Sequence, residues 1–368
     1  MKICYLSNSA VPSSNASSIQ IIKMCEAFSE LDNEVMLITT NVKVNSYNIM
    51  NFYNVKKKFT IKKLKQFEKF PLGINYYLFS LLSIFESLKF KPEIYITRNF
   101  FTCFLLVLLR KKVLIELHHD LSIESRIVQF LVKRFKFLNS KYIKKIIAIT
   151  YGVKKEYVDK KFVKSDKIIV LPSGSSLKIK KNLISHKKSL KIGYFGSLYK
   201  SRGLDLIKKL SKLDKKNEYF LYGNLKNFNN QRYRSNINNL HFCDYVPYKD
   251  ISKKMFEMDA LIIPYVSQIT VAGDVGNITK FTSPLKLFDY LTAGKIILCS
   301  DFVVLREAVS SKNVVFVKNY KNPYSWKMEL NKIINQNEKR LIFSFNNQKL
   351  SKNYSLKERA KKILKIII

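Results

Sequence analysis

The sequence alternates short apolar runs with amphipathic stretches, and this alternation constrains the fold more than any other feature. In the first half of the chain the apolar runs have the length of strands, and they occupy Lys2–Ser7, Glu34–Thr39, Ile94–Thr97, Val113–His118, Lys145–Ile149 and Ile168–Leu171. Between them, apolar residues recur at helical spacing over Ser18–Leu31, Phe100–Leu109 and Glu124–Phe135. Strands that alternate with helices predict a parallel sheet with helices on both faces.

A second series of the same kind follows a polar, lysine-rich stretch, Leu177–Lys188, which reads as an interdomain linker. Its strands are expected at Lys191–Phe195, Tyr219–Tyr222, Leu240–Phe242, Ala260–Pro264, Ile296–Cys299 and Val314–Val317. Two domains fit comfortably into 368 residues. We therefore predict an α/β fold of two doubly wound domains with a cleft between them, over residues 1–180 and 181–350, and a closing helical segment over residues 351–368.

The cysteines and the apolar runs indicate the cellular compartment of the protein. The five cysteines are scattered and mostly lie inside apolar runs, which predicts reduced core residues in a cytosolic protein without disulfides or structural zinc. The N-terminal residues MKICYLSNS read as a first strand and not as a signal peptide. The longest uncharged run, Pro71–Phe85, is shorter than the roughly 20 residues of a membrane-spanning helix.

The formal net charge of +39 calls for an anionic partner. A helical wheel of Lys56–Lys69 places four lysines on one side, Lys58, Lys62, Lys65 and Lys69, and most of the apolar residues on the other. A basic amphipathic helix of this kind suits the surface of an anionic membrane. Two alternatives stay open: a solvated face of a lysine-rich protein, and nucleic acid, for which no binding motif accompanies the charge.

The segment Phe281–Asp301, FTSPLKLFDYLTAGKIILCSD, predicts a phosphate site. Ser283 is a candidate helix cap, Pro284 stands where a missing N–H costs nothing, and a helix from Leu285 would present free N–H groups. Lys286 would add a cation one turn into the helix, and Asp289 an acceptor for sugar hydroxyls.

A second candidate loop, Phe195–Gly203 (FGSLYKSRG), leaves the first strand of the second series. Gly196 permits a tight turn, and Lys200 and Arg202 place two cations where a diphosphate would lie. The alternative is a basic loop in a basic protein.

Three loops of the first series are candidates as well. Glu116–Asp120 (ELHHD) puts His118 at the end of a strand, and Arg98 ends the strand before it. The loop Asn8–Ser18 would line the ligand crevice, although it lacks the glycines of a dinucleotide-binding fingerprint. Leu171–Ser176 (LPSGSS) reads as a plain turn.

Together these motifs resemble the GT-B glycosyltransferases of family 4, over essentially the whole chain and in the same order. SPLKLFDYLTAGKIILCSD with VLREAV is similar to the donor-binding segment of that family, and KIGYFGSLYKSRGLDLI to its G-x-L and K/R-G loop. IYITRN, LIELHHD, KKIIAITYGVKKEY, IIVLPSGSS and YVPYKDISKKMFEMDALIIPY resemble further strand ends and turns of the family. The final YSLKERAKKIL resembles the helix that crosses back onto the first of two Rossmann-like domains.

The resemblance implies a retaining, hexosyltransferase-like enzyme that moves a sugar from a nucleotide diphosphate sugar to a glycan or lipid-linked acceptor. It implies no metal, because Arg202 and the helix start at Ser283–Leu285 would neutralise the leaving diphosphate, with Lys200 as our own addition. Asp289 would bind the ribose and His118 the donor sugar. The acceptor would bind the first domain, where we place Arg98. We expect a role in polysaccharide or lipopolysaccharide synthesis, in the cytoplasm at the inner membrane face.

The sequence also departs from the family pattern. Phe281 occupies the first acidic position of the E-x7-E pair, for which Asp274 is a candidate substitute, and Asp289 replaces the second glutamate. Ser197 stands where many members have arginine. These departures indicate a rearranged donor site. Two alternatives remain, a non-catalytic membrane-associated GT-B subunit and a GT-B nucleotide-sugar epimerase.

Overall fold

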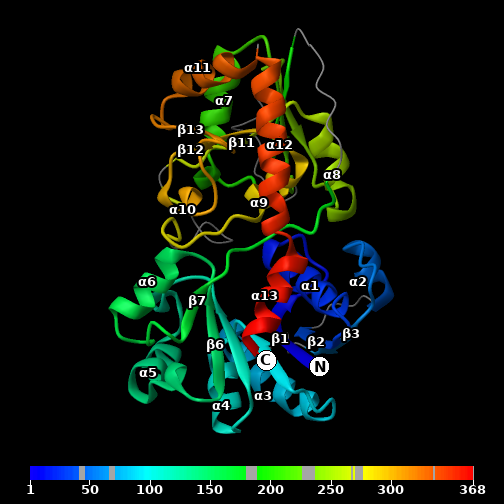
Figure 1. Cartoon of the computed structure of the whole chain (residues 1–368), viewed down its shortest axis with the longest axis vertical. Helices are drawn as coiled ribbons and strands as arrows, with labels where there is room; N and C mark the ends of the chain where they lie inside the picture. Colours follow the sequence, from blue (N-terminus) through cyan, green and yellow to red (C-terminus); the bar gives the residue numbers. More distant parts are fainter. Residues whose placement is uncertain are drawn as a thin grey trace. The chain divides into compact units, whose positions relative to one another are not determined.

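The computed structural model describes residues 1–40, 46–65, 71–179, 189–225, 237–266, 268–269, 277–334 and 336–367. They form two compact units, shown in Figure 1: one comprises Met1–Ser173 and Leu356–Ile368, and the other Gly174–Ser355. Each unit is built on a parallel sheet, so the predicted α/β class is confirmed.

The first unit contains a seven-stranded sheet with the order β3-β2-β1-β4-β5-β6-β7. Its strands are β1 (Lys2–Ala10), β2 (Glu34–Thr40), β3 (Thr60–Leu64), β4 (Ile94–Thr97), β5 (Val113–Leu117), β6 (Ile143–Ala148) and β7 (Ile168–Val170). The direction of winding reverses between β1 and β4, and ligands of such folds bind outside the carboxyl ends of the strands at a reversal of this kind.

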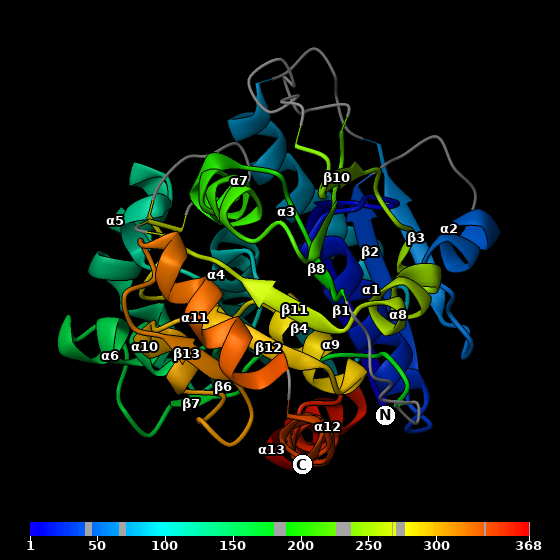
Figure 2. The ribbon, with the colours of Figure 1, turned by 90° about the horizontal axis from the view of Figure 1, so that it is seen from above.

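Helices cover both faces of the first sheet (Figure 2). α1 (Ala16–Ser29) and α13 (Leu356–Ile367) lie on one face, and α3 (Leu72–Leu88), α4 (Phe100–Leu108) and α5 (Arg126–Phe135) on the other. α2 (Ser46–Phe52) and α6 (Tyr151–Asp159) complete the unit, with short 3-10 turns at Leu121–Ile123 and Phe137–Asn139. Leu356, Ala360 and Ile363 of α13 belong to the same buried cluster as Ile21 and Phe28 of α1. The final helix therefore belongs to the first unit, as the resemblance implies.

The second unit contains a six-stranded parallel sheet with the order β10-β9-β8-β11-β12-β13. Its strands are β8 (Lys191–Phe195), β9 (Glu218–Tyr222), β10 (Leu240–Cys243), β11 (Ala260–Ile263), β12 (Ile296–Ser300) and β13 (Val315–Val317). Its helices are α7 (Leu204–Leu213), α8 (Tyr248–Glu257), α9 (Leu285–Ala293), α10 (Val303–Arg306), α11 (Pro323–Ile334) and α12 (Asn337–Asn353), with a 3-10 turn at Lys200–Arg202. α7 packs with α11, and α9 packs with α8 and α12. The described strands are mostly buried, as parallel strands between helices should be.

Many of the apolar side chains are buried in the cores of these two units. Cys4, Cys25, Cys103 and Cys299 are fully buried, which confirms their prediction as core residues. None of the helices in the described ranges is long and apolar enough to cross a membrane.

The prediction of a basic amphipathic helix over Lys56–Lys69 is wrong. Residues Thr60–Leu64 form strand β3, which pairs in parallel with β2 at the edge of the sheet. The reason is a period of two: Phe59 and Ile61 alternate with polar neighbours and pack on the core of the unit. Lys62 forms an ion pair with Glu86 (3.1 Å), Lys58 precedes the strand and Lys65 follows it, so these lysines do not form one stripe of a helix. Lys69 lies outside the described residues.

Candidate functional site

In the second unit, the loop after β8 is shaped by two glycines in the left-handed region. Gly196 has φ of +151°, and Gly203 has φ of +83°. A Cβ on Gly203 would lie 1.7 Å from the carbonyl oxygen of Pro264, just after β11, so only glycine lets the two loops approach this closely. This approach positions Arg202, whose guanidinium carbon lies 5.6 Å from the ring centre of Tyr265.

Lys286 of α9 points toward the same loop. Its Nζ lies 4.1 Å from the ring centre of Tyr194 and 5.7 Å from that of Tyr265, and a Cβ on Gly196 would lie 2.7 Å from it. This ammonium is buried without a hydrogen-bond partner among the described residues. Burial, together with the nearby Arg202 guanidinium, holds the pKa of Lys286 well below its usual range. Aromatic faces are poor compensation for a buried cation, so an anion would bind here favourably.

The N-terminus of α9 lies beside these cations, but its cap differs from the prediction. The capping position is Pro284, which makes no side-chain hydrogen bond to the helix, so Ser283 does not occupy the cap position. Ser283 was predicted from its capping propensity, but the helix begins one residue later, at Leu285. Tyr290 of α9 accepts a hydrogen bond at Oη from the backbone N–H of Phe195 (2.8 Å), which ties the helix to the end of β8. The start of α9 therefore lies at the edge of the second sheet where the strands have their carboxyl ends.

Asp289 is buried one turn further along α9. Its Oδ1 accepts hydrogen bonds from the Ser175 hydroxyl (2.5 Å) and the Tyr248 hydroxyl (3.5 Å). Burial raises the pKa of Asp289 to about 7, and the two hydroxyls offset only part of that effect. Ser175 comes from the LPSGSS turn, so this turn orients the carboxyl group. Phe281 is buried at 7% exposure, before α9.

The first unit holds a second charged cluster, centred on Glu116 of β5. Its Oε1 accepts a hydrogen bond from Arg359 Nη1 (2.7 Å), and its Oε2 accepts from Arg98 Nε (2.9 Å) and Tyr5 Oη (3.1 Å). Glu116 is 1% exposed. Burial by itself would raise its pKa, but Arg359 and Arg98 outweigh burial and hold the pKa of Glu116 well below its usual range.

His118 and Arg98 form the outer part of this cluster. The Nε2 of His118 lies 3.5 Å from Glu116 Oε2, and its side chain is 23% exposed. Burial and the positive charge of Arg98 lower the pKa of His118 to about 4, so the imidazole is neutral at pH 7. The Nη2 of Arg98 is buried without a hydrogen-bond partner among the described residues. Two guanidiniums share one carboxylate here, which leaves a net positive charge beside a neutral histidine.

The structure thus gathers the predicted residues into two groups, one in each unit. Gly196, Arg202 and Lys286 lie together with the start of α9, and His118 lies with Arg98. The side chain of Lys200 lies outside the described part, as does Asp274. No group of three or more His, Cys, Asp or Glu side chains in the described ranges is arranged to hold a metal ion.

The sequence analysis gave Glu116 no role beyond the start of the ELHHD loop and missed Arg359, although the sequence marks both. Glu116 is a lone charge inside the apolar strand VLIEL, and Arg359 falls on the apolar stripe of α13 with Leu356, Ala360 and Ile363. A charge on a core-facing position needs a partner, and a Glu and an Arg of this kind are natural candidates for each other. No feature of the sequence singles out Tyr194 and Tyr265, because aromatic residues are common in protein cores.

Several solved structures have a similar architecture. The crystal structure of Anabaena Alr3699/HepE in complex with UDP matches with a TM-score of 0.72 at 12% identity, over 99% of this chain and 99% of that one. A glycosyltransferase from Rickettsia africae matches with a TM-score of 0.73 at 14% identity, over 100% and 97% of the two chains. WaaG, a glycosyltransferase involved in lipopolysaccharide biosynthesis, matches with a TM-score of 0.64 at 13% identity, over 99% of each.

These likenesses show the fold and not the activity, because the identities are low. No protein-family model matches the chain, and no curated protein matches it in sequence. Membership of family 4 therefore stays a prediction. The chain has the GT-B fold of two Rossmann-like domains.

Proposed function

We propose that this protein is a retaining, metal-independent glycosyltransferase that uses a nucleoside diphosphate sugar as donor. The observation that carries the proposal is Lys286, whose Nζ is buried near Arg202 at the start of α9 and has no hydrogen-bond partner in the described part of the chain. A diphosphate would supply the negative charge that Lys286 lacks among these residues. HepE, of the same fold, was crystallised with UDP and with UDP-glucose.

In the proposed reaction the bond between the anomeric carbon and the diphosphate breaks, and the acceptor oxygen bonds to that carbon. The acceptor hydroxyl proton leaves with the diphosphate. Lys286, Arg202 and the N–H groups of α9 stabilise the charge that develops on the leaving group, which is the work a metal ion does in other transferases. Asp289, oriented by Ser175, binds the ribose.

The resemblance to family 4 assigns the donor sugar to His118. The pKa of about 4 keeps this imidazole uncharged at pH 7. Arg98, with its unpartnered Nη2, binds the acceptor, a glycan or lipid-linked glycan. Glu116 and Arg359 hold Arg98 in position.

Nucleotide binding tests the donor site directly. We expect a nucleoside diphosphate, from a panel of UDP, GDP and ADP, to raise the melting temperature of the wild type, and Lys286→Met to weaken its binding by about tenfold or more. Lys295→Met is the matched control, because Lys295 follows the opposite end of α9 and its Nζ also lies near an aromatic ring, Phe256, at 5.7 Å. If no nucleotide shifts the wild type, or if both variants bind equally well, the donor site is wrong.

Turnover tests the reaction. Incubation with nucleotide sugars should release nucleoside diphosphate in the presence of an acceptor, and NMR of the product should show the anomeric configuration of the donor. Nucleotide binding without release would instead favour the non-catalytic subunit, an alternative that the buried Phe281 at the position of an acid keeps open. Conversion of one nucleotide sugar into another would favour an epimerase.

A further inference from the structure

The helix α3 buries three serines together with Phe79 and Ile84 and leaves most of its leucines exposed. Ser80, Ser83 and Ser87 are fully buried and face the body of the first unit. The opposite face carries large apolar side chains that are 40% to 67% exposed: Ile74, Leu81, Leu82, Phe85 and Leu88. Ile74 and Leu81 are two turns apart, and Leu81, Leu82, Phe85 and Leu88 follow at helical spacing, so they form one stripe along the outer side of the helix. A surface helix normally buries such a stripe.

The buried serines explain how the helix tolerates this orientation. Ser80 donates its hydroxyl to Tyr76 O (2.9 Å), and Ser83 and Ser87 donate to Ser80 O and Ile84 O. Thr102 of α4 donates to Ser80 Oγ (2.9 Å). The small hydroxyl side chains are satisfied locally and allow α3 to pack closely on α4, so the three buried serine hydroxyls are not left unpaired when the leucines point outward.

The exposed apolar surface continues from α3 onto α4 and α5. Ring contacts link the three helices: Tyr77 with Phe101 at 4.8 Å, and Phe104 with Phe135 at 5.7 Å between ring centres. Figure 2 shows the helices side by side on one face of the sheet. On α4 and α5, or directly after α4, the large exposed apolar residues are Leu108, Leu109, Ile127, Phe130 and Phe135. We call these residues and the α3 stripe the α3–α5 surface.

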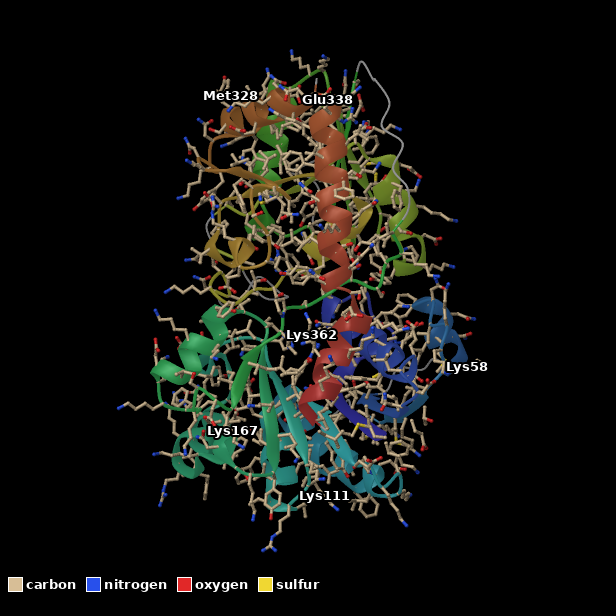
Figure 3. All side chains as sticks on the ribbon, in the orientation of Figure 1. Lys58, Lys111, Lys167, Met328, Glu338 and Lys362 are labelled. Atoms are coloured by element: carbon tan, nitrogen blue, oxygen red, sulfur yellow. The ribbon has the colours of Figure 1, made fainter. Side chains whose placement is uncertain are left out.

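Exposed cations border this surface. They follow α3 and α4 and lie on or beside the last turn of α5: Lys89, Lys91, Arg110, Lys111, Lys112, Lys133, Arg134 and Lys136. Lys111 projects from the first unit where α4 ends (Figure 3). Among acidic residues, Glu86 of α3 is paired with Lys62 and Lys89. The rim is therefore strongly positive.

We propose that the α3–α5 surface docks on an anionic lipid bilayer, lying in the interface without crossing it. Leucine, isoleucine and phenylalanine would enter the boundary between headgroups and acyl chains, and the bordering lysines and arginines would reach the lipid phosphates. A second copy of the chain fits less well, because it would bring the same net charge of +39 against itself. The proposal replaces Lys56–Lys69 as the membrane contact and does not depend on the proposed sugar transfer.

Vesicle flotation of the full chain tests the proposal. We expect binding to phosphatidylcholine vesicles that contain phosphatidylglycerol, weaker binding to phosphatidylcholine alone, and loss of binding as salt is raised. The double variant L81S/F85S should bind about tenfold or more weakly. The matched control is L341S/F345S on α12 of the second unit: Leu81 and Phe85 are 53% and 67% exposed, and Leu341 and Phe345, also four residues apart, are 54% and 67% exposed.

A second measurement uses fluorescence. The chain contains one tryptophan, Trp326, which is fully buried and gives a constant background. The variant F85W should shift its emission to the blue when anionic vesicles are added and not when nucleotide is added. Equal flotation of L81S/F85S and wild type, equal loss in the α12 control, or dimers that L81S/F85S dissociates without any effect on flotation would overturn the proposal.

Discussion

The two units each bury a cluster of charged groups at the carboxyl edge of a parallel sheet, but they balance the charge differently. In the first unit, Glu116 accepts hydrogen bonds from both Arg98 and Arg359, so each guanidinium has a carboxylate partner. In the second unit, Lys286 lies against the rings of Tyr194 and Tyr265, and Arg202 also lies over Tyr265. The carboxyl group nearest in sequence, Asp289, is held by hydroxyls instead.

This difference separates stability from ligand binding. A buried cation with a carboxylate partner contributes to a network whose disruption is costly, while a buried cation without one is destabilising until an anion arrives. The first cluster should therefore hold the unit together and orient His118 and Arg98. The second should weaken the free protein and gain stability from nucleotide.

The largest effect should follow from Glu116→Gln. Removing this carboxylate leaves Arg98 and Arg359 buried without a counter-charge, and we expect a loss of about 3–5 kcal/mol in the free energy of unfolding. Urea titration followed by circular dichroism measures it. Glu358→Gln is the control, because Glu358 neighbours Arg359 on α13 but pairs with Lys361 at the surface. Equal losses in both variants would contradict the role of the cluster.

Asp289→Asn should act through pH. The pKa of Asp289 is raised from 3.8 to about 7 in the folded protein, so ionisation of the unfolded chain costs the wild type stability as pH rises through this window. The variant lacks that cost. Its advantage over wild type should grow by roughly 2–3 kcal/mol between about pH 5 and pH 8.5. Parallel urea titrations at the two pH values measure it.

Asp301→Asn is the control for this test. The hydrogen bonds from Arg306 lower the pKa of Asp301, so its carboxylate is ionised in the folded and the unfolded chain at both pH values, and the variant should lose the same stability at pH 5 and pH 8.5. An advantage of Asp289→Asn that is the same at both pH values would show that Asp289 is ionised in the folded protein.

Lys286→Met should stabilise the free protein. Methionine fills a similar volume without a buried charge, and we expect a gain of about 1–2 kcal/mol together with the loss of nucleotide binding described above. Thermal unfolding with and without nucleoside diphosphate measures both effects. The sign is opposite to that of Glu116→Gln, so a destabilised Lys286→Met protein would remove the contrast between the two clusters.

The smallest effect should be on the titration of His118. Its pKa of about 4 means that its ring signals should stay those of a neutral imidazole down to about pH 5. Arg98→Gln removes a positive charge and should raise the midpoint by about one unit. NMR of the histidine ring carbons measures both. A midpoint near 6.5 in the wild type would show that His118 is not held in the buried cluster.

Local features of the sequence predicted the second cluster well. Gly196, expected to permit a tight turn, has a positive φ, as does Gly203 at the end of the same loop, and Lys286 lies at the start of a helix that ends before Gly294. These features depend on neighbours in the sequence. That Lys286 lacks a counter-charge among the described residues could not be predicted, because its surroundings come from Tyr194 on β8 and Tyr265 in the loop after β11.

Tertiary packing decided the structure of two segments that local pattern alone does not settle, and for one of them the prediction failed. The spacing of apolar residues in Lys56–Lys69 is compatible with a helix and with a strand. Pairing with β2 makes the segment Thr60–Leu64 a strand. In α3, the sequence contains an apolar stripe and a serine stripe, and the usual rule would turn the leucines inward. Close packing of the serines on α4 turned the helix the other way.

The sequence by itself determined the α/β class, the two successive series and the glycine-shaped loop before α7, because periodicity and backbone conformation are set by adjacent residues. Only the tertiary structure decided which buried charges meet. Glu116 and Arg359 are 243 residues apart, and they pair because α13 returns to the core of the first unit. The tertiary structure also decided that Lys286 has no such partner in the described part of the chain. Charge balance in a protein interior depends on distances in space, which the order of residues along the chain does not fix.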